Sequence, residues 1–223
     1  AAGLVLAGGP SAFGANRTKA NNTSNLNTTA SWTGGVVPGA FDVGLWSNTV
    51  TAANDVLLGG DLSFGGIAVF NPGGAIYVSG SNSLTLGVFG VDMARSAQAL
   101  TVSPEGLRLA TNASVTWNVT NGLTLTMNPT NLFRNSGAVL AITNIGTVAT
   151  ATITNDTTGI IGTWARHGMG TATKYATVSG GIVTGFSGTA AATAADVGDA
   201  GGTTNYADSP TAEIIVTGFR RSL

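Results

Sequence analysis

The amino-acid sequence predicts an all-β chain wound into a right-handed parallel β-helix, or β-solenoid. Apolar and small polar residues alternate over residues 83–127, a period of two that is typical of strands with one buried face. Glycine, asparagine and proline separate the short apolar pairs, as expected where the chain turns between strands. No segment repeats its apolar residues with the helical period of about 3.6 residues. Short strands at this spacing also suit an antiparallel β-sandwich or jelly roll, which is the alternative fold.

The elements follow in three parts. Residues 1–31 hold an apolar strand and an Asn- and Thr-rich loop or irregular first turn, residues 32–186 form the solenoid body, and residues 187–223 form a loop and a β-prone C-terminal strand. In chain order, the sequence predicts body strands over 41–46, 55–58, 62–64, 67–70, 75–78, 84–86, 100–102, 107–109, 115–117, 123–125, 139–142 and 148–153. Glycine-bearing connections between these strands suit corners that need a positive φ.

The composition describes a nearly uncharged surface. Charged residues make up 9% of the chain and the formal net charge is −1, whereas an ordinary soluble domain has roughly 25% charged residues. Little charge repulsion opposes association between copies. Scattered basic residues do not form the positive patch that nucleic acid requires, so we expect no nucleic-acid partner. The chain has no cysteine, and no apolar run reaches the roughly 18 residues of a transmembrane helix.

The residue types that carry chemistry are few and scattered. His167 is the one histidine, and the sequence predicts an exposed or locally hydrogen-bonded loop side chain after Trp164. Turn and cap roles explain the single carboxylates, although a solenoid could align two of them on adjacent turns as a glycosidase requires. These carboxylates include Asp42, Asp55, Asp61, Asp92, Glu105 and Asp156. We therefore predict no catalytic residue, cofactor or metal site, and a chain that is not an enzyme.

The four tryptophans suit two roles, packing in a core or stacking on sugar rings. They are Trp32, Trp46, Trp117 and Trp164. Trp117 alternates with Val115 and Val119, so its side chain shares their face and is predicted to be buried.

Two groups of motifs resemble a known family. Thr116-Trp117-Asn118-Val119 is followed by Gly122-Leu123-Thr124-Leu125-Thr126, and Gly159-Ile160-Ile161-Gly162-Thr163-Trp164-Ala165 comes later. With Trp32-Thr33-Gly34-Gly35, they make residues 31–200 resemble the autotransporter-associated β-strand repeat of bacterial surface proteins. The resemblance implies a parallel β-helix displayed outside the cell as an adhesin or stalk. Residues 213–221 also resemble the start of the plug in TonB-dependent receptors.

The functional expectation follows from the fold and the neutral surface. We expect a secreted bacterial structural protein, extracellular or on the cell surface, that polymerises with copies of itself into a filament or surface layer. The end strands would form the contact, because unpaired strand edges are templates for pairing. The expected interface residues are Leu4, Val5, Leu6, Ile214, Ile215, Val216 and Phe219. An adhesin module that binds surface polysaccharide is the second candidate, and a polysaccharide-active β-helix enzyme is the third.

Overall fold

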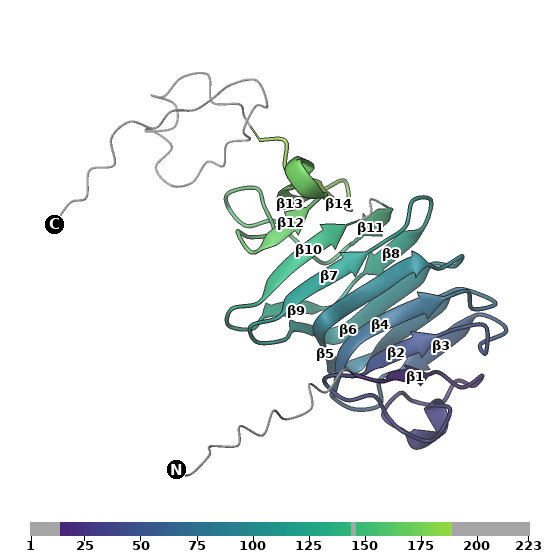
Figure 1. The fold of residues 1–223 in the computed structure, drawn as a ribbon. Helices are drawn as coiled ribbons and strands as arrows, with labels where there is room; N and C mark the ends of the chain where they lie inside the picture. Colours follow the sequence, from purple (N-terminus) through teal and green to yellow (C-terminus); the bar gives the residue numbers. More distant parts are fainter. Residues whose placement is uncertain (1–13, 144–145, 189–223) are drawn as a thin grey trace, which may run out of the picture.

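The computed structural model describes residues 14–143 and 146–188, which form an all-β parallel β-solenoid of about six turns (Figure 1). The turns stack from β1 at one end of the body to β13 and β14 at the other (Figure 1). The elements of this described part are β1 (Asn16–Thr18), η1 (Thr29–Ser31), β2 (Val43–Trp46), β3 (Asn54–Leu57), β4 (Leu62–Phe70), β5 (Ile76–Arg95), β6 (Leu100–Leu109), β7 (Ser114–Asn118), β8 (Thr124–Met127), β9 (Asn131–Arg134), β10 (Val139–Thr143), β11 (Thr147–Ala149), β12 (Ala165–His167), η2 (Gly170–Ala172), β13 (Lys174–Ser179) and β14 (Ile182–Gly185). The predicted solenoid is confirmed.

The strands line up as three faces, because the long strands bend from one face to the next. The first face runs through β1, β2, the second half of β4, the end of β5, β7, β10 and β12. The second face runs through β3, the start of β5, the start of β6, β8 and β11. The third face runs through the start of β4, the middle of β5, the end of β6 and β9. All of these pairings are parallel, which is the arrangement of a coil and not of a sandwich.

Like residues stack from turn to turn inside the coil. Leu62 lies opposite Leu84, Leu84 opposite Leu107, and Leu107 opposite Leu132, so each turn adds about 22 to 25 residues here. The period is irregular because register shifts occur, for example between Phe64 and Gly66 in β4. A bulge of this kind inserts residues on one strand and bends it. The stacked apolar residues form one core along the body.

The alternation seen in the sequence decides which side chains enter this core. Val115, Trp117 and Val119 are fully buried, so the predicted inward direction of Trp117 is confirmed. Trp32 and Trp46 are also buried, and Trp164 is partly buried against the core. Core packing is therefore the role of Trp32, Trp46 and Trp117, and these three rings are not available for stacking on sugars.

Residues 19–33 cover the N-terminal end of the described core. The backbone N–H groups of Leu26 and Asn27 donate to the carbonyls of Leu57 and Leu58, at 2.9 and 3.0 Å. The Trp32 ring packs edge-on against Trp46 and Phe64, each with 5.8 Å between ring centroids. Part of the segment predicted as a loop or irregular first turn is thus β1 and η1, and it closes one end of the solenoid.

An antiparallel hairpin covers the other end. β13 pairs with β12, β14 pairs with β13, and β14 also pairs with β11, so the hairpin joins the first and second faces. Asn155 completes the closure, because its side-chain amide bonds both the carbonyl and the N–H of Val178, at 2.9 and 2.7 Å. The last strands of the first and second faces are thereby paired at this end, so they offer no free edge to which another strand could add.

Candidate functional site

The outward side chains of the described body are mostly small and uncharged. On the second face Thr101 lies opposite Thr126, Thr124 opposite Thr147, and Ser79 opposite Ser103. Such stacked hydroxyl residues suit strands that are exposed on one side. Their hydroxyl groups can bond water, which explains how a chain with 9% charged residues can expose three sheet faces to solvent.

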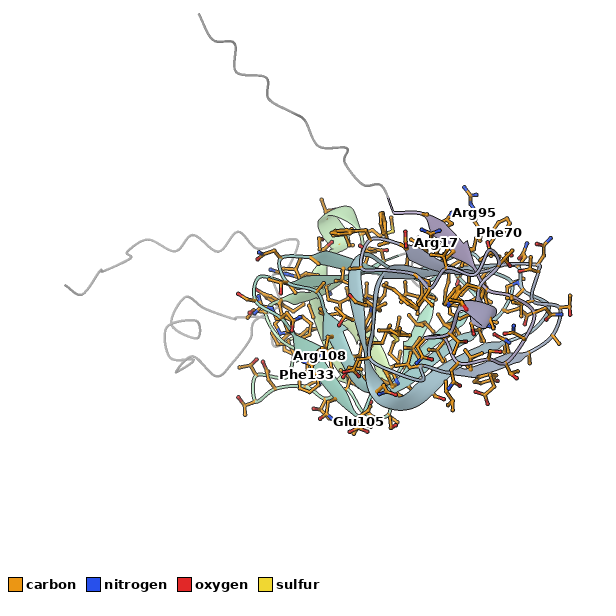
Figure 2. All side chains as sticks on the ribbon, turned by 90° about the horizontal axis from the view of Figure 1, so that it is seen from below. Arg17, Phe70, Arg95, Glu105, Arg108 and Phe133 are labelled. Carbon is orange, nitrogen blue, oxygen red and sulfur yellow. The ribbon has the colours of Figure 1, made fainter. Side chains whose placement is uncertain are left out.

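Three arginines stand out against this neutral surface, because each stacks on an aromatic ring of a neighbouring strand. The guanidinium carbon lies 6.0 Å from the ring centroid for Arg95 on Phe70, 4.2 Å for Arg108 on Phe133, and 3.9 Å for Arg166 on Tyr175. Arg95 and Phe70 lie on the opposite side of the body from Arg108 and Phe133 (Figure 2). The first pair belongs to the first face and the second pair to the third. Cation–π contacts of this kind favour a fixed position of the arginine.

A groove crosses the outer side of the first face near its N-terminal end. Its volume is about 430 Å³ and it reaches from β1 across β2 and β4 to β5. The lining residues are Asn16, Val43, Leu45, Ile67, Ala68, Val69, Phe70, Phe89, Asp92 and Arg95. We refer to this set as the first-face groove. Most of its floor is aliphatic, and residues Phe70 and Phe89 are 43% and 44% exposed.

The polar groups of the first-face groove keep unused hydrogen-bonding capacity. The Asp92 Oδ1 atom accepts from the Ala94 N–H at 2.9 Å and from Asn118 Nδ2 at 3.1 Å. The second carboxylate oxygen, Oδ2, has no partner among the described residues. Arg95 forms no hydrogen bond or ion pair to any described residue, and the same holds for the Asn16 side-chain amide. The groove thus combines an apolar floor with free donors and a free acceptor, as ligand sites do.

An ion pair holds the strand next to this groove. Arg17 Nε donates to Asp42 Oδ2 at 3.2 Å, and Asp42 also accepts the N–H groups of Ala15 and Gly39. Burial works against ionisation of Asp42, but the N–H groups of Gly39 and Ala15 and the Arg17 guanidinium outweigh it and lower the pKa of this carboxyl. Asp42 therefore stays ionised as an anchor for β1, and its role is structural.

The other predicted carboxylates lie apart from one another. Asp61 accepts the N–H of Ser83 at 2.8 Å, and Asp156 accepts the hydroxyl and N–H of Thr158 at 2.6 and 2.8 Å. The Asp156 contacts are the expected local turn role, whereas the Asp61 contact joins two neighbouring turns of the solenoid. Asp55 is exposed on the second face and Glu105 is exposed on β6. Within residues 14–143 and 146–188, no three His, Asp or Glu side chains gather where they could hold a metal ion.

Two titratable groups that burial removes from water, His167 and Lys19, are not part of the groove lining. His167 is half-buried in β12, so the predicted loop position is wrong, and burial lowers its pKa. Its strand forms because β10 provides a parallel partner on one side and β13 an antiparallel one on the other. Lys19 is fully buried under the N-terminal cover, and burial lowers its pKa to about 8. Its ammonium donates to two oxygens of Asn22, at 2.7 and 2.8 Å, and to the Ala20 carbonyl at 3.0 Å.

Sequence reasoning missed the first-face groove. Its lining residues come from three neighbouring turns and β1, and they become neighbours through the register Leu45 opposite Ala68 and Ala68 opposite Asp92. The sequence held one signal of the groove, namely an apolar residue such as Val43 at an outward position of an alternating strand. The predicted interface residues at positions 4–6 and 214–219 lie outside the described residues.

Comparison with protein-family models, curated proteins and solved structures finds no significant match. The structure shows a β-solenoid, and the family resemblance of residues 31–200 stays a prediction. In the part of the chain that the structure describes, no helix has the length and apolar character to cross a bilayer.

Proposed function

We propose that this chain is a structural protein of a bacterial outer surface. Its function is to supply a stiff, rod-shaped solenoid as a building element. The observation that carries the proposal is the continuous core of about six stacked turns beneath three faces of small uncharged side chains. Stacked turns contact mainly their neighbours, so a solenoid makes a stiff rod with broad faces. The resemblance to the autotransporter-associated strand repeat supports the same role and an extracellular location.

Assembly into a filament or layer would use the segments beyond the described body. The described ends are covered by residues 19–33 and by the β13–β14 hairpin, so the body by itself presents few free strands for stacking. Leu4, Val5 and Leu6 at one end and residues 214–216 with Phe219 at the other carry the β-prone patterns that suit strand addition. A head-to-tail contact between them would generate an open polymer when the rotation between neighbouring subunits does not close a ring.

Two deletions test this assembly. Removing residues 1–9 or residues 212–223 should abolish polymers in analytical ultracentrifugation, because each deletion removes one half of the contact. The circular dichroism of both variants should keep the β-sheet spectrum of the intact chain, because neither deletion touches the described core. Replacing Leu4, Val5 and Leu6 by isoleucine is the matched control and should preserve the polymers. Polymers that persist in either deletion variant would refute the terminal contact.

Polysaccharide adhesion is the second candidate function, and the first-face groove is the observation that favours it. Its lining contains one carboxylate, Asp92, whereas glycoside hydrolysis ordinarily needs two carboxyl groups about 5 to 10 Å apart. The groove therefore supports binding better than it supports cleavage.

A further inference from the structure

We propose that the first-face groove binds an extended polysaccharide of neutral pyranose sugars. This inference names the ligand class for the second candidate function, on which it rests, and it is argued from the groove's aromatic residues, its free polar groups and its charge balance. It remains valid whether or not the terminal segments assemble the chain.

The apolar part of the groove matches the flat face of a sugar. Phe70 and Phe89 expose their rings beside the aliphatic floor of Val43, Leu45 and Ala68. A pyranose ring has C–H groups on its faces, and these pack on aromatic and aliphatic surface as other apolar groups do. The cation–π contact with Arg95 helps to hold the Phe70 ring in place.

The polar part matches the hydroxyl rim of the same sugar. A hydroxyl group both donates and accepts a hydrogen bond, so it needs acceptors and donors side by side. Asp92 Oδ2 is a free acceptor, the Arg95 guanidinium is a free donor, and the Asn16 amide supplies both kinds of atom. The Asn118 amide and the Ala94 N–H hold the Asp92 carboxylate in position for this contact.

The charge of the lining selects a neutral ligand. Asp92 and Arg95 are its charged members, so their charges cancel. A polymer with a carboxylate on each sugar would bring negative charge to Asp92, and a polymer of amino sugars would bring positive charge to Arg95. The other charged residue of the lining attracts the same polymer and offsets this repulsion, so a charged polymer gains no net attraction and still gives up part of the hydration of its charges. Both classes of polymer should therefore bind less well than an uncharged one.

The backbone under the groove offers a peptide no free edge of β2, β4 or β5, which leaves the outer edge of β1 as the one strand edge beside it in the described body. A peptide usually gains its affinity by pairing with a free strand edge. β2, β4 and β5 are paired with one another under the groove, so their N–H and C=O groups are already used. The groove offers polar side chains instead, and these suit a ligand that is recognised through hydrogen bonds to its hydroxyl groups.

The geometry of the turns favours a chain of sugars. Strands in a sheet lie about 4.8 Å apart, which is close to the advance of one pyranose unit along an extended glycan. The groove crosses the four strands β1, β2, β4 and β5, so a glycan along the solenoid axis would place about three sugars in it.

Isothermal titration of the full chain with hexasaccharides tests the site. The neutral probes are the hexamers of β-1,4-glucan and β-1,4-mannan, which are extended chains. The charged probes are hexagalacturonate and the chitosan hexamer, the latter at a pH where its amino groups are protonated. At least one neutral hexamer should bind with a Kd below about 1 mM, and both charged hexamers should bind more weakly. Arg95→Ala and Phe89→Ala should each raise this Kd by at least about tenfold, because each removes a direct contact.

Arg108→Ala is the matched control. Arg108 stacks on Phe133 as Arg95 stacks on Phe70, but it lies on the third face and away from the groove (Figure 2). Its loss should leave the Kd unchanged. The proposal is overturned if no neutral hexamer binds at 1 mM, if a charged hexamer binds more tightly than the neutral ones, or if Arg95→Ala does no more than Arg108→Ala.

Discussion

Two fully buried tryptophans differ in one hydrogen bond, and this difference predicts unequal costs for the same substitution. Trp46 Nε1 donates to Asn54 Oδ1 at 3.0 Å. Trp117 Nε1 is buried and has no hydrogen-bond partner within the described residues. Both rings are fully enclosed by core side chains, so Trp→Phe removes a similar apolar volume at each site. The N–H group then decides which variant is the less stable.

The size of the difference follows from two terms. Trp46→Phe leaves the Asn54 oxygen, in a residue that is 3% exposed, without its donor. An unsatisfied buried group costs about 1–3 kcal/mol of unfolding free energy. The Trp117 N–H is already unsatisfied in the folded chain and carries such a cost. Trp117→Phe removes this cost, which offsets part of the free energy lost with the packing of the larger ring. We therefore expect Trp46→Phe to destabilise the chain by at least about 2 kcal/mol more than Trp117→Phe.

Urea unfolding of the full chain, followed by far-UV circular dichroism, measures both variants. The denaturant slopes must agree with that of the unmodified chain, so that the two free energies compare the same transition. A double-mutant cycle with Asn54→Ala isolates the Trp46–Asn54 contact and should give a coupling of about 1 kcal/mol. Equal costs for the two Trp→Phe variants, or a larger cost at Trp117, would refute the reasoning.

Four further substitutions test the turns and the two covered ends. Gly90 has a φ of +55° and its added methyl would overlap the Thr116 backbone, so Gly90→Ala should cost about 3 kcal/mol or more in urea unfolding. Gly122→Ala, at a φ of +82° in open space, should cost about 1 kcal/mol from strain alone. The pKa of Lys19 falls from 10.5 to about 8 on folding, so the unfolded chain binds more protons between these pH values. Stability should therefore rise from pH 8 to 10.5, and a Lys19→Met variant that keeps this rise would contradict the assignment. Val183→Asp places a charge at the buried position of β14 in the β13–β14 hairpin and should lower the thermal midpoint by at least about 8 °C. An unchanged midpoint would show that the hairpin does not seal the core.

The strands of the body could be predicted because their pattern is local. Alternation decides which side chains face inward, and Val115 and Trp117 behave as this rule requires. The strand pattern does not predict β1, β9, β12, β13 or β14. β1, β9 and β12 have three or four residues each, and all five form by pairing with a neighbouring turn or with each other. Tertiary partners override local propensity in such short strands.

The first-face groove could not be predicted from the sequence for a related reason. Its rings and charges come together through the register between turns, and bulges change that register by different amounts in different turns. One residue of slip would exchange the inward and outward sides of a strand. Asp92 and Val43, which lie in the same groove, are therefore unrelated in the linear pattern.

Negative-stain electron microscopy of the intact purified chain tests the central claim most directly. The claim is that this solenoid is a structural subunit that associates through its terminal segments. The account predicts fibres or ordered lattices whose repeat matches the length of one stacked body. Separate, uniform particles at every protein concentration would contradict it.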